Sequence, residues 1–276
     1  MNLQELKKIT TEFPLTNKMP VLFLGHGSPM NAIEDNEFVR NFQALGISLP
    51  TPHAILCISA HWLTNGTSVT AMEKPPTIHD FGGFPEELFQ QQYPAPGSPE
   101  LAKLTQSIIK ETSISLDHSW GLDHGAWTVI KHLYPAANIP VIQLSIDYTK
   151  PASWHFNLAK ELSALRNRGV LIIGSGNIIH NLRMIDFANF HKDDYGYDWA
   201  IEARYKFNQY ITTGNMDPLL HWEKLGSYAK YAIPTPDHYF PLLYTLGTKE
   251  EQEPLKIFND KLMAGSLSMT SIQIGA

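Results

Sequence analysis

Apolar residues along the chain gather in short runs, and most of these runs are rich in Val, Ile and Leu. Near-continuous apolar runs of this length are typical of strands that are covered on both faces of a sheet. The pattern predicts strands at Val21–Gly25, Ala54–Ala60, Ser68–Met72, Pro140–Ile146, Val170–Gly174 and Ser268–Ile274.

Three stretches between these runs have the residue spacing of amphipathic helices. They are Pro99–Glu111, Ser153–Arg168 and Asp198–Thr212. Gly169 is a termination signal for the second helix, and the third carries Ile201, Tyr205 and Phe207 between charged residues. Alternating strands and helices predict an α/β fold, with a central, mostly β-sheet core flanked by helices. In such sheets the active site lies at the carboxyl ends of the strands.

Two segments depart from this alternation. Residues 75–99, "PPTIHDFGGFPEELFQQQYPAPGSP", are rich in Pro, Gly and aromatic residues, and we expect an irregular active-site loop there. Residues 1 to about 18 are polar and mixed in charge, and we expect an N-terminal extension. We expect residues 1–276 to form one catalytic domain, because no repeat or internal linker divides them.

Composition narrows the class of protein. Of the 276 residues, 43% are hydrophobic and 17% are charged, which permits a sizeable core. The formal net charge of −6 argues against a nucleic-acid or anionic-membrane binder, so we expect neither partner. A single cysteine, Cys57, and the lack of a signal peptide or membrane span predict a cytoplasmic protein. The oligomeric state stays open.

The placement of the 12 histidines is the main chemical signal. His26 and His61 each follow an apolar run, in "LFLGHGSP" and "AILCISAHW", and His180 follows "VLIIGSGNII". His124 lies in "WGLDHGAW", and His238 lies at the expected start of a helix in "PTPDHYFPLLY". Because strand ends converge on one crevice, and imidazole is a common metal ligand, the pattern suits a Zn(II) or non-haem Fe(II) site.

Other motifs are weaker. "GSGNII" has the first two glycines of a dinucleotide fingerprint, but Ile179 stands at the third position. The chain has no phosphate-binding P-loop, no HExxH zinc motif and no G-x-S-x-G nucleophile elbow.

Several motifs together resemble the DOPA 4,5-dioxygenase family, in particular its bacterial YgiD-type group. These proteins are class III extradiol ring-cleavage dioxygenases, related to the catalytic subunit of protocatechuate 4,5-dioxygenase. The resemblance extends from about residue 20 to the C-terminus and rests on "LFLGHGSPM", "SAHW", "PPTIHDFGGFP", "YPAPGSP", "WGLDHGAW", "GSGNIIHNLR", "PTPDHYFPLLY" and "GSLSM".

The resemblance implies a mononuclear Fe(II) centre that cleaves a catechol, with DOPA as the expected substrate and dioxygen as the second. His26, His61 and His238 resemble the metal ligands, although a carboxylate third ligand at Asp237 stays open. His180 resembles the catalytic acid/base and is also expected to contact the metal when no substrate is bound. His124 resembles a second catalytic histidine, which contacts the substrate.

The loop and the metal chemistry give further expectations. We expect His79, Phe81, Phe84 and Asn177 to line the substrate site, and Gly82–Gly83 to let the loop approach closely. Ligation by imidazole alone also favours Zn(II), which competes well with Fe(II) at nitrogen ligands, so purified protein is expected to carry zinc. Two alternatives stay open at this point: a zinc hydrolase that uses the same histidines, and a non-catalytic interaction protein of the Memo type.

Overall fold

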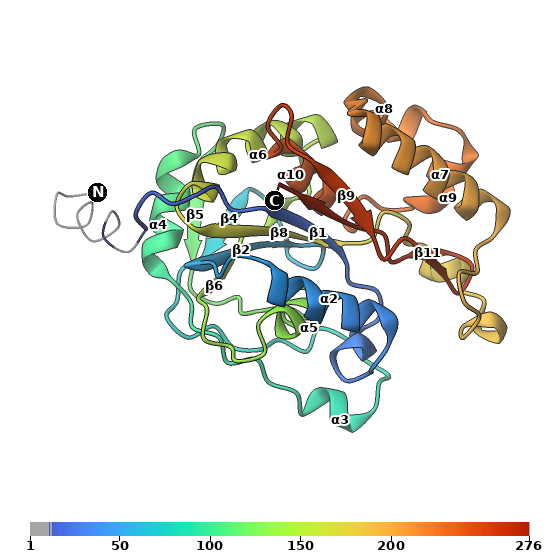
Figure 1. Ribbon diagram of the computed structural model, residues 1–276, viewed down its shortest axis with the longest axis horizontal. Helices are drawn as coiled ribbons and strands as arrows, with labels where there is room; N and C mark the ends of the chain where they lie inside the picture. Colours follow the sequence, from blue (N-terminus) through green and yellow to red (C-terminus); the bar gives the residue numbers. More distant parts are fainter. Residues whose placement is uncertain (1–10, 12, 276) are drawn as a thin grey trace.

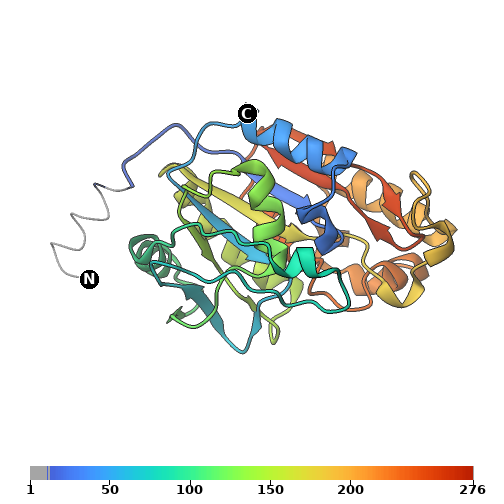
Figure 2. The same ribbon diagram turned by 90° about the horizontal axis from the view of Figure 1, so that it is seen from below.

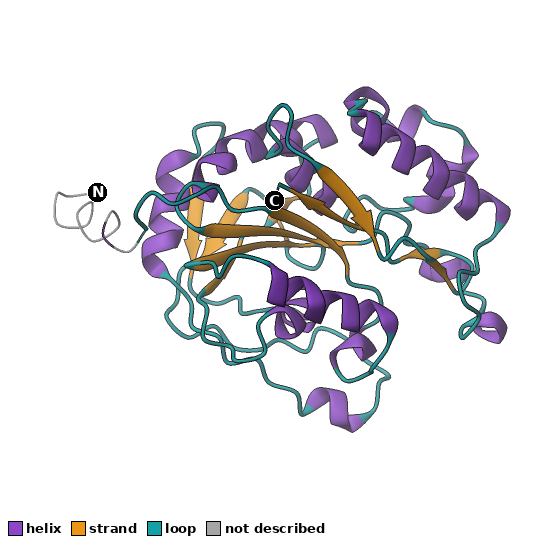
Figure 3. Cartoon of the chain, viewed as in Figure 1, coloured by secondary structure: helices purple, strands orange, loops and turns teal. Residues whose placement is uncertain are grey.

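A six-stranded sheet runs through the middle of the molecule, with helices on both sides (Figure 3). The computed structural model describes residues 11 and 13–275, so most of the expected N-terminal extension lies outside the described residues. In spatial order the strands are β6 (Val141–Gln143), β2 (Ala54–Ser59), β8 (Val170–Gly176), β1 (Val21–Gly25), β12 (Ser271–Ile274) and β9 (Leu255–Phe258). The first four are parallel to one another, whereas β12 runs antiparallel to both β1 and β9. The predicted α/β fold with a central sheet is confirmed.

Alternate residues of the central strands enter two separate cores. In β8, Val170 and Ile172 face one core, whereas Leu171 and Ile173 face the other. Because side chains alternate across a strand, a strand buried on both faces must be apolar at nearly every position. The near-continuous apolar runs therefore have their physical origin in helices packed on each face.

Different helices cover the two faces of the sheet (Figures 1 and 2). α2 (Glu37–Ser48) and α5 (His124–Leu133) pack together on one face. α10 (Phe240–Gly247) and α6 (Ala152–Arg166) pack on the other, with α4 (Pro99–Ile108) against α6. The apolar positions Leu158, Leu162 and Leu165 of α6 are buried, as their spacing predicted.

Smaller elements surround this arrangement. α7 (Asp198–Thr213), α8 (Met216–Leu220) and α9 (Ser227–Ala232) lie together at the end of the molecule away from α4 (Figures 1 and 2). Three short strand pairs complete the chain: β3 (Leu63–Thr64) with β7 (Ile146–Asp147), β4 (Thr67–Thr70) with β5 (Ile114–Asp117), and β10 (Leu262–Met263) with β11 (Leu267–Ser268). Short 3-10 helices occur at Pro29–Ala32, Leu182–Met184, Phe187–Asn189 and Trp222–Lys224.

Three local predictions need correction. The run Pro140–Ile146 is split between β6 and β7, which pair with different strands, and Ser268–Ile274 is likewise split between β11 and β12. In α7, Ile201 and Tyr205 are exposed, whereas Phe207 is buried. The buried face of α7 is made by Ala200, Ala203, Phe207 and Ile211. The small alanines allow close packing on this face. The prediction rested on large apolar residues and therefore did not include the alanines.

The segment 75–99 is irregular, as predicted, apart from one short helix, α3 (Glu86–Phe89). It is fastened to the chain near α5, where the amide of Ile78 donates to the carbonyl of Leu122 and the amide of Leu122 donates to the carbonyl of Pro76. Among the described residues, no helix has the length and apolar character needed to cross a membrane.

Candidate metal centre

Five histidines meet at the carboxyl ends of the parallel strands. His26 follows β1, His61 follows β2 and His180 follows β8, as the sequence pattern predicted. His124 is the first residue of α5, and His238 lies just before α10. The ring centroids of His26, His61 and His238 are 4.9 to 5.2 Å apart, and the ring of His124 lies 3.9 Å from that of His61.

The hydrogen bonds of His26 fix which of its nitrogens carries the proton. The hydroxyl of Ser175 donates its only proton to the carbonyl of Gly125, so at 3.0 Å it accepts from Nδ1–H of His26. The Nε2 atom of His26 therefore keeps a lone pair. It lies 3.4 Å from Nε2 of His61. In the tautomer of His61 whose Nδ1–H faces the carboxylate of Asp80, 3.5 Å away, that nitrogen also has a lone pair.

A carboxylate fixes the tautomer of His238, and another lies beside Nδ1 of His124 without a hydrogen bond. Nδ1 of His124 is 3.0 Å from Oδ2 of Asp80, and Nδ1 of His238 is hydrogen-bonded to Oδ2 of Asp237. Donation from Nδ1 to a carboxylate leaves Nε2 available as a ligand, and metal-binding histidines are usually oriented in this way. Asp237, a candidate ligand by sequence, therefore lies behind His238 as its hydrogen-bond acceptor.

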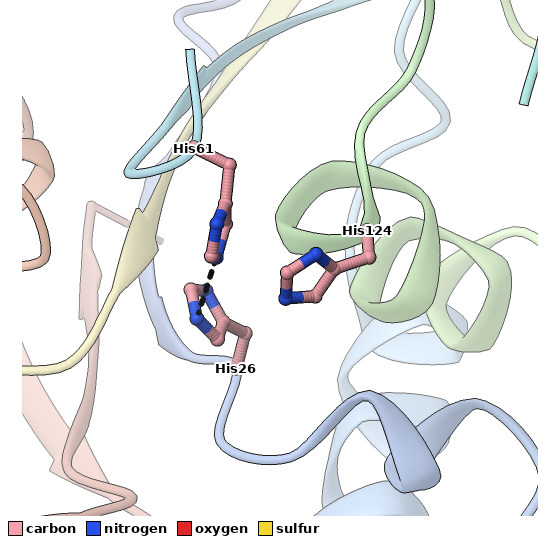
Figure 4. Close-up of side chains that lie close together, drawn as sticks. All are labelled: His26, His61 and His124. Atoms are coloured by element: carbon pink, nitrogen blue, oxygen red, sulfur yellow. Dashed lines mark hydrogen bonds between the residues drawn. The ribbon is translucent and has the colours of Figure 1, made fainter. Parts of the chain in front are cut away.

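Figure 4 shows His26, His61 and His124 turned toward one another from three different elements. One nitrogen of each lies within 4.8 Å of a nitrogen of the other two, a grouping that can hold a metal ion. His238 stands next to this group, and its ring stacks on that of His180 with centroids 3.5 Å apart and planes at 7°. The structure thus gathers all the predicted ligands and adds His124 to the histidines that can ligate.

Three imidazoles of the site are kept neutral by their surroundings. Burial, reinforced by the neighbouring histidines, holds the pKa values of His26 and His61 well below the ordinary 6.5. Burial and the adjacent His238 lower the pKa of His180 to about 3. Burial opposes ionisation of Asp80, but its hydrogen bonds with His124 and the nearby His61 lower the pKa of that carboxyl overall. Neutral imidazoles beside an ionised carboxylate form a donor set suited to a divalent cation.

The glycines next to His26 make room for a distant segment of the chain. A Cβ on Gly25 would lie 2.6 Å from the backbone oxygen of Met269, and a Cβ on Gly27 would lie 2.5 Å from the Met269 sulfur. Gly27 also has a φ of +63°, which favours glycine. These glycines therefore make room for the segment around Met269, rather than for a metal or a substrate.

The aromatic part of the 75–99 loop lies against the histidines. The ring of Phe81 is 5.5 Å from that of His124 and 5.5 Å from that of Phe84. His79 is 5.7 Å from Phe81, and its Nε2 is hydrogen-bonded to the carbonyl of Gln91. A Cβ on Gly82 or Gly83 would meet no protein atom within 4 Å, so packing within the chain does not require glycine there, and the expected close approach to a substrate stays a prediction. Gly83 is suited instead to its φ of +78°.

The side chain of Asn177, which was expected at the substrate site, is hydrogen-bonded to the backbone at both its nitrogen and its oxygen. Its amide nitrogen donates to the carbonyl of Ser268, and its side-chain oxygen accepts from the amide of Gly27. The side chain is buried and ties the turn after β1 to the segment before β12. In this structure Asn177 positions the His26 turn.

Sequence reasoning missed three buried polar residues that support the histidines: Ser175, Ser59 and Asp123. The hydroxyl of Ser59 donates to Oδ1 of Asp123 at 2.6 Å and accepts weakly from the amide of His61 at 3.3 Å. Asp123 also caps α5 by accepting from the amide of Ala126. An Asp followed by the apolar spacing of an amphipathic helix, and serines at strand ends, are signals that could have identified these positions.

The residues present fit a divalent metal. Two lone-pair-bearing nitrogens 3.4 Å apart repel each other unless a cation or a proton lies between them. The depressed pKa values of both rings disfavour a proton. This arrangement is the chemistry expected of a metal site.

Comparison with known proteins agrees with this geometry. The family model described as the catalytic LigB subunit of aromatic ring-opening dioxygenase matches residues 20–272. The chain is 48% identical to a 4,5-DOPA dioxygenase extradiol of Escherichia coli K12, over 94% of this chain and 96% of that protein. It is 35% identical to a 4,5-DOPA dioxygenase extradiol of Beta vulgaris, over 92% of this chain and 96% of that protein.

A solved structure shows the same fold. The crystal structure of an uncharacterized protein from Escherichia coli K12 superimposes with a TM-score of 0.79 and 44% identity, over 94% of this chain and all of that one. A family match across most of the chain favours ring-opening oxidation over the hydrolase and interaction-protein alternatives. The chain belongs to the LigB family, the extradiol ring-cleaving dioxygenases.

Proposed function

We propose that this protein is an Fe(II)-dependent extradiol dioxygenase that cleaves DOPA or a closely similar catechol with dioxygen. The observation that carries the proposal is the close approach of the Nε2 atoms of His26 and His61, 3.4 Å apart, within a buried group of histidines that can hold a metal ion. The similarity to proteins named 4,5-DOPA dioxygenase extradiol supports the choice of substrate.

We assign His26 and His61 as two of the metal ligands and His238 as the third. The tautomer of His238 is fixed by Asp237, and its ring lies about equally far from those of His26 and His61. His124 competes for the same role, because its nitrogen belongs to the tightest grouping. The absorption spectrum of the Co(II)-loaded protein distinguishes His238 from His124 as the third ligand. Loss of a ligand changes that spectrum in His238→Ala, whereas His124→Ala should leave it nearly unchanged.

Iron bound here would supply open positions for a catechol and dioxygen, together with the redox chemistry that joins them. The remaining work falls to side chains of this chain. His180 is neutral at physiological pH, so it can accept the proton of a catechol hydroxyl and return it to the product. Its stacking on His238 fixes the plane of its ring next to the proposed ligand.

Other residues shape the surroundings of the substrate. Phe81 and Phe84 present aromatic faces next to His124, and such faces suit a catechol ring. We assign His124 a contact with the substrate, with Nδ1 beside Asp80 and Nε2 free to meet a hydroxyl. The ionised Asp80 stabilises positive charge that develops on His124 during proton transfer.

The test is dioxygen uptake by protein reconstituted anaerobically with Fe(II), with DOPA added and the semialdehyde product followed by absorbance. We expect one dioxygen consumed per DOPA, and a fall in turnover of at least about 100-fold in His180→Gln. A matched control is His53→Gln, because His53 lies away from the cluster near Gly169. Catechol binding without dioxygen uptake would refute the proposed activity.

Metal specificity is part of the proposal. Nitrogen ligands favour Zn(II) over Fe(II), so we expect protein purified in air to carry zinc and to be inactive until the metal is exchanged. Elemental analysis before and after exchange, paired with the uptake assay, measures this. Turnover by a zinc-loaded, iron-free sample at the rate of the iron form would contradict the redox role and point to another mechanism.

A further inference from the structure

Within the part of the chain that the structure describes, Asp80 is the side chain of the irregular loop that faces two histidines of the cluster. Its Oδ1 accepts from the backbone amide of His124 at 2.8 Å. Its Oδ2 faces Nδ1 of His124 at 3.0 Å and Nδ1 of His61 at 3.5 Å. Both carboxylate oxygens therefore lie against groups of α5 and of the turn after β2, whereas Asp80 itself belongs to the loop.

The position of this carboxylate at the start of α5 strengthens the contact. His124 is the first residue of the helix, and its amide has no partner within the helix. A carboxylate that accepts from such an amide also interacts favourably with the positive end of the helix dipole. Asp80 thus satisfies a donor that the helix cannot, while it orients the side chain of the same residue.

The neighbours of Asp80 are attached to the same helix. The indole nitrogen of Trp127 in α5 donates to the carbonyl of Ile78 at 2.9 Å. On the other side, the ring of Phe81 meets the edge of the His124 ring. Figure 4 shows the ring of His124 leaving α5 toward His61 and His26, so the loop residue that holds His124 acts directly on the cluster. Docking of the loop and orientation of the histidines depend on the same contacts.

We propose that Asp80 is a positioning residue that couples docking of the 75–99 loop to metal binding. The inference rests on the metal centre proposed above. With the loop docked, the Nδ1 atoms of His61 and His124 lie 3.5 and 3.0 Å from Oδ2 of Asp80, which leaves Nε2 of His61 for the metal and Nε2 of His124 for the substrate. With the loop undocked, both imidazoles lose this partner. Because coupling between two equilibria is reciprocal, metal binding must favour the docked loop by the same factor that docking favours metal binding.

The test measures both sides of this coupling in the full-length protein. Affinity for Co(II) is measured by chelator competition, and hydrogen exchange of the amides of Ile78 and Leu122 is measured with and without Co(II). These amides donate across the contact between the loop and the start of α5. The variants are Asp80→Ala, which removes both oxygens, and Asp80→Asn, which keeps one acceptor for the His124 amide. The matched control is Glu86→Gln, which removes a charge from an exposed position of the same loop.

We expect the wild-type protein to bind Co(II) and to protect both amides when it does so. Asp80→Ala should bind about 10 to 100 times more weakly, without metal-dependent protection. Asp80→Asn should fall between it and the wild type, and Glu86→Gln should match the wild type. If Asp80→Ala does not fold, the same comparison is decided by Asp80→Asn.

The outcomes separate the two proposals. A wild-type protein that binds no Co(II) refutes the metal centre itself. A wild-type protein that binds Co(II), alongside Asp80 variants of unchanged affinity, refutes only the coupling. Weaker binding in the variants, with no metal-dependent protection in the wild type, also refutes the coupling, since Asp80 would then only support the histidines.

Discussion

Gly125 is the point at which helix α5 comes closest to His61, and Gly125→Ala tests how tightly the histidines are held. An added Cβ would lie 2.5 Å from the hydroxyl of Ser59 and 2.7 Å from Cδ2 of His61. Ordinary contacts of a Cβ are 3.4 Å or more, so one of these groups must move by most of an ångström. Ser59 is held by Asp123, so the strain falls largely on His61.

Two opposing effects set the size of the change. In an unconstrained helix, Gly→Ala stabilises by up to about 1 kcal/mol, because alanine has the higher helix propensity. Crowding of a packed interior costs about 1–3 kcal/mol. We therefore expect a net loss of about 1–2 kcal/mol. The loss in metal affinity should be larger, about 10- to 100-fold, because His61 is displaced from the position that its carboxylate partner supports.

The assay compares urea unfolding of metal-free protein and Zn(II) affinity in Gly125→Ala, the wild type and Gly82→Ala. The last variant is the matched control, because a Cβ on Gly82 meets nothing within 4 Å. It should leave both measurements close to the wild-type values. If Gly125→Ala is as stable as the wild type and binds Zn(II) equally well, the close approach of α5 to His61 does not constrain the site.

Further expected outcomes concern pH, metal and a buried ion pair. His26, His61 and His180 together should cost the metal-free protein about 4 kcal/mol of unfolding free energy between pH 7.5 and 5.5, and His155 and His132, whose pKa values burial also lowers, add to this loss. In this pH range His26, His61 and His180 take up protons in the unfolded protein, whereas their lowered pKa values keep them neutral in the folded protein. A urea unfolding midpoint that does not change between the two pH values would contradict this. Zn(II) at 100 times its Kd should add about 2.7 kcal/mol in the same melts, and His26→Ala should abolish most of the gain. Arg166→Met should destabilise by about 3 kcal/mol, because it leaves Glu253 without its buried partner; a loss below about 1 kcal/mol would show that this pair contributes little.

Much of the fold could be predicted because its physical cause is local. A strand buried on both faces needs apolar residues at consecutive positions, as in β1 and β8. Such a strand can therefore be recognised from its sequence. The assignment of His26, His61 and His180 to strand ends followed from the same reasoning. The division of Pro140–Ile146 between two sheets could not be predicted, because the pairing partner of each half is decided by distant strands.

The supporting contacts of the site were harder to predict, because they join residues that are far apart in the sequence. Ser175 fixes the tautomer of His26 only because its hydroxyl donates to the carbonyl of Gly125. No spacing along the chain indicates that these three residues meet. Asp80 has two histidine partners from different elements. Asn177 looked like a substrate residue beside His180, whereas its amide is used by the backbone of Gly27 and Ser268.

The position of β12 next to β1 has a consequence for the order of assembly. The amide of Gly25 donates to the hydroxyl of Ser271, a residue 246 positions further along the chain, and Met269 packs over Gly25 and Gly27. During synthesis, β1 and the turn that presents His26 therefore cannot make these contacts until almost the whole chain has been made. Contacts this distant form late and slowly. A chain interrupted before residue 269 would lack these contacts to β1 and to the His26 turn, so we expect it to bind a metal more weakly than the full chain.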